Sequence, residues 1–281
     1  MSAQFIEINS KTNKLSAILH PASGAIGVLI IVGGPQYRVG SHRQFVKLSQ
    51  HLSAHSIPSL RLDSSGMGDS SGEKTEFYQQ TADIDAAIET MFTQMPQLQK
   101  VVLWGLCDAA SAILLKMNHA DPRIAGLILL NPWVRQEQSH AATMLKHYYV
   151  KRLVSREFWR KIFSGGLAFK RSITDFWQTW RSSKQQSTLN SAKQTEYSAS
   201  NYVQHMLTGW QKTNAETLLI SSGNDLTAQE FLDLCLQNAQ WQQCFNKAKR
   251  LHINEANHTF SSAKWRKQVE QASSDFILAM K

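Results

Sequence analysis

The chain has 281 residues, of which 42% are hydrophobic and only 6 are prolines, so it can build one globular domain with a sizeable core and is not expected to be disordered. Its polar N-terminus lacks a charged start followed by an apolar run, and no stretch approaches the ~18 apolar residues of a membrane-spanning helix, which predicts a soluble, cytoplasmic protein. The formal net charge is +9, which raises nucleic acid, an anionic membrane or an acidic substrate as partners.

Short apolar runs alternate with amphipathic segments along the first 130 residues. Buried strands are predicted at 14–20, 27–32, 57–62, 100–104 and 124–130, and helices at 42–55, at 81–91 and from residue 108. In the first of these helices, Phe45, Leu48 and Leu52 form one apolar face suited to packing on a sheet. The glycines, serines and aspartates at 63–72 predict a loop.

The same alternation returns near the C-terminus, with strands expected at 216–221 and 250–253, a helix at 229–236 and a terminal helix. Strands alternating with helices predict an α/β fold with a mostly parallel sheet covered on both faces. Residues 135–210 interrupt this rhythm. We therefore expect an α/β core made of residues 1–134 and 211–281, with a helical basic cap at 135–210 over the carboxyl ends of the strands, where such sheets bind ligands.

Cys107 stands where the strand in VVLWGLCDAAS meets the following helix. A nucleophile on such a sharp turn needs small neighbours, and Gly105 and Ala109 provide them. A helix N-terminus also favours the thiolate form of a cysteine. The alternative is a small buried residue without a chemical role. The other cysteines, Cys235 and Cys244, complete an odd set without disulfide or CxxC spacing, which favours a reducing compartment.

An acid and a histidine follow in the order that a nucleophile on such a turn predicts. Asp225 lies in a loop after the apolar run ETLLIS, and His258 lies after the last predicted strand. In this arrangement His258 takes the thiol proton and later protonates the leaving group, while Asp225 orients the imidazole. Each residue alone also fits an ordinary loop. Their order predicts a Cys107–His258–Asp225 triad.

An oxyanion hole needs two backbone N–H groups directed at the developing negative charge. One is expected from Asp108, directly after the nucleophile, and the other from Gly34, because Pro35 has no N–H. The glycines at 33 and 34 also fit a simple turn of the chain.

Several segments together resemble the exosortase A system-associated hydrolases of type 1, a family of α/β-hydrolases. They are GGPQYRVGSHRQF, LRLDSSGMGDSSG, VVLWGLCDAAS, ILLNPWVR, SGNDLTAQEFLDL and EANHTFSSAKWR, and they span nearly the whole chain. The resemblance implies an α/β-hydrolase fold, catalytic positions at Cys107, Asp225 and His258, and a bacterial setting beside an exosortase and exopolysaccharide biosynthesis. It implies no particular substrate.

Residues 135–210 hold roughly twelve Lys and Arg against four Asp and Glu, and aromatic residues recur at helical spacing between the basic ones at 145–163. The favoured interpretation is a cap that packs its apolar face over the pocket. Contact with an anionic membrane surface is a second interpretation, which would place the protein peripherally at the inner membrane. Nucleic acid is the least favoured, since no binding motif accompanies the charge.

Arg38, His42 and Arg43 follow the glycines and are candidates for binding an anionic group of the substrate, although helix capping and surface charge are the favoured interpretation. No His, Cys or Asp cluster has metal spacing, and the glycines at 33, 34 and 40 make neither a phosphate loop nor a dinucleotide fingerprint. Neither a metal nor a cofactor is expected.

The function expected from these residues is hydrolysis or transfer of an acyl group from an ester or thioester through an acyl-enzyme on Cys107. A thioester or an activated ester is the better fit, because thiolate attack on a thioester gives another thioester. A small-molecule acyl compound is the expected substrate, and the exopolysaccharide setting that the resemblance implies adds lipid-carrier and saccharide acyl compounds. The alternative is a catalytically silent scaffold that docks through its basic cap.

Overall fold

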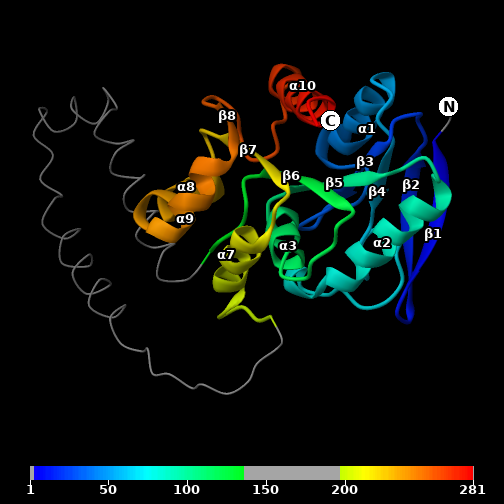
Figure 1. The fold of residues 1–281 in the computed structure, drawn as a ribbon, viewed down its shortest axis with the longest axis horizontal. Helices are drawn as coiled ribbons and strands as arrows, with labels where there is room; N and C mark the ends of the chain where they lie inside the picture. Colours follow the sequence, from blue (N-terminus) through cyan, green and yellow to red (C-terminus); the bar gives the residue numbers. More distant parts are fainter. Residues whose placement is uncertain (1–2, 136–196, 281) are drawn as a thin grey trace, which may run out of the picture. The chain divides into compact units, whose positions relative to one another are not determined.

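The computed structural model describes residues 3–135 and 197–280. The chain divides into two compact units, one made of Met1–Val134 and Tyr197–Lys281 and the other of Arg135–Glu196. The predicted cap therefore lies mostly outside the described residues. All described residues except Arg135 belong to the first unit (Figure 1).

An eight-stranded sheet with the order β1-β2-β4-β3-β5-β6-β7-β8 forms the centre of this unit. The strands are β1 (Gln4–Ser10), β2 (Asn13–His20), β3 (Ile26–Ile31), β4 (Ser59–Leu62), β5 (Lys100–Leu106), β6 (Ile124–Leu130), β7 (Glu216–Ser222) and β8 (Lys249–Ile253). β1 and β2 pair in antiparallel fashion, as do β2 and β4, and every other pair is parallel. This arrangement confirms the predicted α/β-hydrolase fold.

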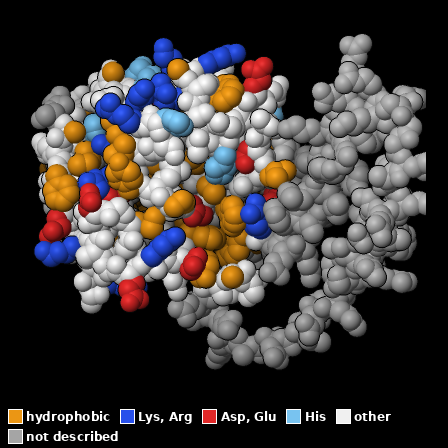
Figure 2. All heavy atoms as spheres, turned by 180° about the vertical axis from the view of Figure 1, so that it is seen from behind, with side chains coloured by type: hydrophobic (Ala, Val, Ile, Leu, Met, Phe, Trp, Pro, Cys, Tyr) orange, Lys and Arg blue, Asp and Glu red, His pale blue; other side chains and the backbone are white. Residues whose placement is uncertain are grey.

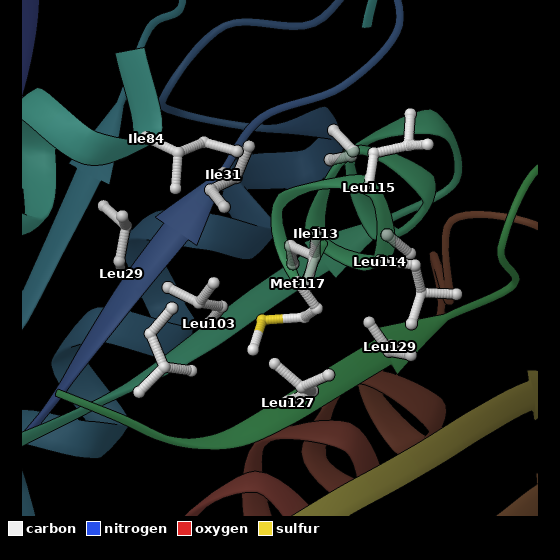
Figure 3. Close-up of a cluster of buried hydrophobic side chains, with 14 of the residues drawn as sticks. Leu29, Ile31, Ile84, Leu103, Ile113, Leu114, Leu115, Met117, Leu127 and Leu129 are labelled. Carbon is white, nitrogen blue, oxygen red and sulfur yellow. The ribbon is translucent and has the colours of Figure 1, made fainter. Parts of the chain in front are cut away.

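Helices cover both faces of the sheet. Side chains alternate between the two faces along each strand, so the apolar strands supply a core on each face that helices must cover. Leu29 and Ile31 of β3 face the larger core with α2, α3, α7, α8 and α9, while Val28 and Ile30 face α1 and α10. Figure 3 shows the centre of the larger core. The helices are η1 (Ser41–Arg43), α1 (Gln44–Ala54), η2 (Phe77–Gln79), α2 (Thr81–Gln94), α3 (Asp108–Lys116), α7 (Tyr202–Lys212), α8 (Leu226–Gln237), α9 (Ala239–Lys247) and α10 (Ala263–Leu278).

Three elements were not expected from the sequence pattern. β1 is an edge strand with only Ile8 and Ser10 buried, so its apolar signal is weak. α9 buries Trp241, Cys244 and Phe245 on one face between polar residues. α7 lies within the range assigned to the cap, yet it packs on α3 as part of the first unit.

The surface of the described residues is mixed. In Figure 2, Lys and Arg side chains are most numerous near the upper edge of the visible face, and basic, acidic and hydrophobic side chains are interspersed over the rest of it. Over residues 3–135 and 197–280, no helix combines the length and apolar character needed to cross a membrane.

Gly209 sets the distance between α7 and α3. A Cβ at this position would lie 2.0 Å from the carbonyl oxygen of Leu114, a backbone atom that cannot move aside without moving α3. We expect Gly209→Ala to lower the free energy of unfolding by about 1–3 kcal/mol through overpacking, despite the better helix propensity of alanine. Denaturant unfolding measures this change. Gly126→Ala is the matched control, because its Cβ would meet the flexible end of Met280; equal losses in both variants would contradict the account.

Candidate active site

Cys107 is the single residue between β5 and α3, and its backbone conformation is strained. Its φ of 64° and ψ of −126° lie outside the regions that side-chain-bearing residues normally adopt. The Cys107 N–H donates to the carbonyl of Leu130 at 2.8 Å, which ties the turn to β6. A Cβ on Gly105 would lie 2.8 Å from the backbone carbon of Ala109, so the strand and helix leave no room there for a larger residue.

Asp225 and His258 lie together after β7 and β8. His258 Nδ1 is 2.8 Å from Asp225 Oδ2, and the Asp225 carboxylate also accepts the N–H groups of Thr227 and Ala228, each at 3.2 Å. Asp225 is thereby the N-cap of α8, where a helix terminus stabilises negative charge. These contacts leave the Asp225 side chain 9% exposed and the His258 side chain 33% exposed.

The imidazole of His258 bridges the carboxylate and the thiol. Burial by itself lowers the pKa of His258, but hydrogen bonds to Asp225 and Cys107, together with their negative charges, outweigh burial and raise the pKa from 6.5 to about 10. The structure therefore brings the three sequence-predicted triad residues together, with a charged imidazole between two acidic groups at neutral pH.

Asn131 is a fourth residue of this site that the sequence reasoning missed. It is fully buried after β6 and has a φ of 44°. Its Nδ2 donates to Ser222 Oγ at 2.8 Å and to the backbone carbonyl of His258 at 3.1 Å, and its Oδ1 accepts the N–H of Ser222 at 3.0 Å. Asn131 thus joins the end of β7 to the loop that carries His258. The only signal in the sequence was a polar residue directly after an apolar strand.

The two glycines after β3 approach the first turn of α3 closely. The Gly34 N–H donates to Asp108 Oδ2 at 2.8 Å, and the N–H of Ala109 donates to Asp108 Oδ1 at 3.0 Å. A Cβ on Gly33 would lie 2.0 Å from Asp108 Oδ1. Burial raises the pKa of Asp108, against the opposing effect of these backbone N–H groups and of Lys74. The two N–H groups expected to form the oxyanion hole are therefore neighbours, and the Gly34 N–H is occupied by a carboxylate of the same chain.

Arg38 is built into the protein and does not point an unpaired charge at a substrate. Its guanidinium forms ion pairs with Asp63 and Asp69, and its backbone N–H also donates to Asp63, which is fully buried. This cluster fixes the loop after β3 to the loop after β4. His42 and Arg43 have exposed side chains and consecutive left-handed backbone conformations, with φ of 53° and 58°.

A metal centre was not expected from the sequence. Over residues 3–135 and 197–280, no group of three His, Cys, Asp or Glu side chains is placed to bind a metal ion.

Comparison with known protein families matches residues 27–230 to the family described as serine aminopeptidase, S33. The chain belongs to this family. The S33 match confirms an α/β-hydrolase enzyme. It covers Cys107 and Asp225 but ends before His258, so the histidine is assigned by its contacts with Asp225 and Cys107.

Solved structures of esterases share the fold of this S33 α/β-hydrolase. The esterase Pf2001 of Pyrococcus furiosus has a TM-score of 0.66 at 13% identity, covering 99% of this chain and 92% of its own. Est1E of Butyrivibrio proteoclasticus, with ferulic acid bound, has a TM-score of 0.63 at 15% identity over 97% of this chain and 98% of its own. DcsB, in complex with a substrate analogue, has a TM-score of 0.64 at 13% identity over 99% and 98%. A search of curated proteins found no match.

Replacing Asn131 tests its connection to the triad. Asn131→Gly keeps a residue that tolerates the positive φ but removes three hydrogen bonds, so we expect the free energy of unfolding to fall by about 2–4 kcal/mol. The pKa of His258, followed by NMR, should also fall from about 10 toward 6.5. Asn118→Ala loses the hydrogen bonds that the Asn118 side chain donates to the backbone carbonyls of Leu115 and His205, away from the triad. This variant should lower stability without changing the His258 titration. An unchanged His258 titration in Asn131→Gly would contradict the connection.

The raised pKa of His258 also predicts a pH-dependent stability. A folded-state pKa of about 10 against 6.5 gives a stabilisation that is complete below pH 6.5 and is lost as the pH rises toward 10. Asp225→Asn removes the charge but keeps a residue suited to capping α8. The difference in unfolding free energy between parent and variant should therefore be largest just below pH 6.5 and shrink as the pH rises toward 10. Glu255→Gln, an exposed neutralisation in the same loop as His258, should show no such trend; a gap that widens with pH would exclude this explanation.

Proposed function

We propose that this protein transfers acyl groups from an ester or thioester through a covalent acyl-enzyme on Cys107. The observation that carries the proposal is the chain of contacts from Asp225 to His258 to Cys107. These residues follow β7, β8 and β5, and parallel strands bring such positions to one edge of the sheet. The strained turn at Cys107 supports the same assignment, because a nucleophile exposed on a tight strand-to-helix turn is the characteristic feature of hydrolases with this fold.

The proposed reaction has two steps. The Cys107 thiolate attacks the acyl carbon, and the carbonyl electron pair moves to oxygen. When the tetrahedral intermediate collapses, the bond to the leaving group breaks and His258 gives its Nε2 proton to the departing alkoxide or thiolate. Water or another acceptor then gives its proton to His258 and attacks the thioester, which releases the acyl product and restores the thiolate. Asp225 keeps Nδ1 protonated and stabilises the imidazolium.

The oxyanion in both steps would be bound by the N–H groups of Gly34 and Asp108. They belong to adjacent segments, since Gly34 contacts the side chain of the residue that follows the nucleophile. α3 begins at Asp108, so its N-terminal dipole also favours negative charge at this place.

A cysteine nucleophile favours acyl exchange as well as hydrolysis. Attack on a thioester forms a second thioester of similar energy, so the acyl group remains activated for transfer to an alcohol, an amine or water. Family membership supports hydrolase chemistry, and the esterases that share the fold support esters as the substrate class.

A more specific assignment of the substrate rests on the resemblance to the exosortase A system-associated hydrolases. In that setting the acyl substrate would be a saccharide or a lipid carrier of exopolysaccharide synthesis. The basic segment at 135–210 would then cover the pocket or contact an anionic membrane surface.

A silent scaffold is the second candidate, and one observation favours it: the Gly34 N–H is already occupied by the Asp108 carboxylate. A scaffold that docks through its basic segment would form no acyl-enzyme. The test below separates these two functions.

The acyl-enzyme makes a direct prediction with p-nitrophenyl acyl esters. We expect a burst of nitrophenol equal to one per protein molecule and an acyl adduct on Cys107 in the intact mass spectrum. Cys107→Ala should abolish both, lowering turnover by about 1,000-fold or more. Cys244→Ala is the matched control, because Cys244 is another free cysteine and is buried on α9, outside the proposed site. A Cys107→Ala variant as active as the parent would refute the proposal.

A further inference from the structure

The carboxylate of Asp108 lies where the oxyanion of the proposed reaction should lie. Its Oδ2 accepts the Gly34 N–H at 2.8 Å, its Oδ1 accepts the Ala109 N–H at 3.0 Å, and it also interacts with its own backbone N–H. The groups proposed as oxyanion donors, Gly34 N–H and Asp108 N–H, thus both meet the same carboxylate. A carboxylate oxygen and a tetrahedral oxyanion have the same charge and similar hydrogen-bonding requirements.

The surrounding backbone is shaped to admit this carboxylate. A Cβ on Gly33 would fall 2.0 Å from Asp108 Oδ1, so the contact requires glycine at that position. Gly34, by contrast, has a φ of 62° and open space where its Cβ would be. The Asp108 side chain is only partly buried. To free the amides, it would have to rotate about its side-chain bonds.

A carboxylate in this position opposes the reaction that the surrounding groups favour. It occupies the donors, and its charge repels both the Cys107 thiolate and the oxyanion formed from it. The charge of Lys74 also favours the ionised form of this carboxylate.

We propose that Asp108 closes the oxyanion hole in the resting protein and that the acyl oxygen of the substrate must replace its carboxylate before Cys107 can react. This inference rests on the proposed acyl transfer. Displacement has to be driven by substrate binding, so substrates with extended binding surfaces react and small acyl esters react slowly. Asp108 then determines which acyl compounds gain access to the thiolate.

The test compares Asp108→Ala, which empties the site, with Asp108→Asn, which removes the charge but keeps an acceptor oxygen. For p-nitrophenyl acetate we expect kcat/KM to rise about tenfold or more in Asp108→Ala and by less in Asp108→Asn. Glu255→Gln removes an exposed charge from the His258 loop and should leave kcat/KM unchanged. Thermal unfolding midpoints show whether each variant is folded, and Asp108→Asn keeps a polar first residue in α3 if Asp108→Ala is unstable.

A second measurement does not require turnover. 1,1,1-Trifluoro-2-octanone adds the Cys107 sulfur to its carbonyl carbon and leaves an alkoxide in the oxyanion hole, which protects Cys107 from iodoacetamide. Protection should appear at about tenfold lower ketone concentration in Asp108→Ala than in the parent.

The outcomes separate the two proposals. An acyl burst that is absent from both the parent and Asp108→Ala overturns acyl transfer, but a tighter ketone complex in Asp108→Ala would still support closure by Asp108. Lower kcat/KM in folded Asp108→Ala and Asp108→Asn would show that the carboxylate holds Gly34 in a productive position, which overturns closure. Ketone protection that is equal in parent and variant, or absent from both, would overturn it as well.

Discussion

A single strained turn between β5 and α3 decides where the other parts of the site can lie. Cys107 takes a positive φ, which turns its side chain out at the sheet edge. The tight turn brings the backbone of α3 against Gly105, so no larger side chain fits at that position. The same turn directs the first amides of α3 toward the loop after β3. Gly33 must lack a side chain because that loop approaches α3 so closely. One backbone geometry therefore positions both the proposed nucleophile and the proposed oxyanion donors.

Four neighbouring strands are each followed by one residue of the site. In the sheet order β5, β6, β7 and β8, these residues are Cys107, Asn131, Asp225 and His258. Parallel pairing places the ends of these strands at one edge, although up to 151 positions separate the residues in the sequence. Hydrogen bonds then connect the ends: Cys107 to β6, Asn131 to β7 and to the His258 loop, and Asp225 to His258. The buried amide of Asn131 thus connects the strand ends that carry the proposed triad.

Charge is arranged with a clear asymmetry around the thiol. On one side, His258 is held as a cation by Asp225 and Cys107, which supports a thiolate. On the other side, the helix N-terminus and the Gly34 N–H form an anion site that a carboxylate from the same chain occupies. In the proposed mechanism, one side activates Cys107, and the other withholds the stabilisation that the tetrahedral intermediate needs. The proposed closure by Asp108 would thereby slow the reaction of Cys107 with small acyl compounds.

The sequence pattern was enough to predict the α/β-hydrolase fold and the order of the candidate nucleophile, acid and histidine, because alternating apolar periods and glycine-rich turns are local signals. It did not predict β1 and α9, whose apolar positions are few, and it assigned α7 to the cap because packing on α3 is a long-range contact. The hydrogen bonds of Asn131 and the ion pairs of Arg38 were also not predicted. The contact of the Asp108 side chain with Gly34 is seen in the folded chain alone, because it joins residues 74 positions apart. A one-dimensional pattern shows which amides could bind an oxyanion, but the folded backbone determines what already occupies them.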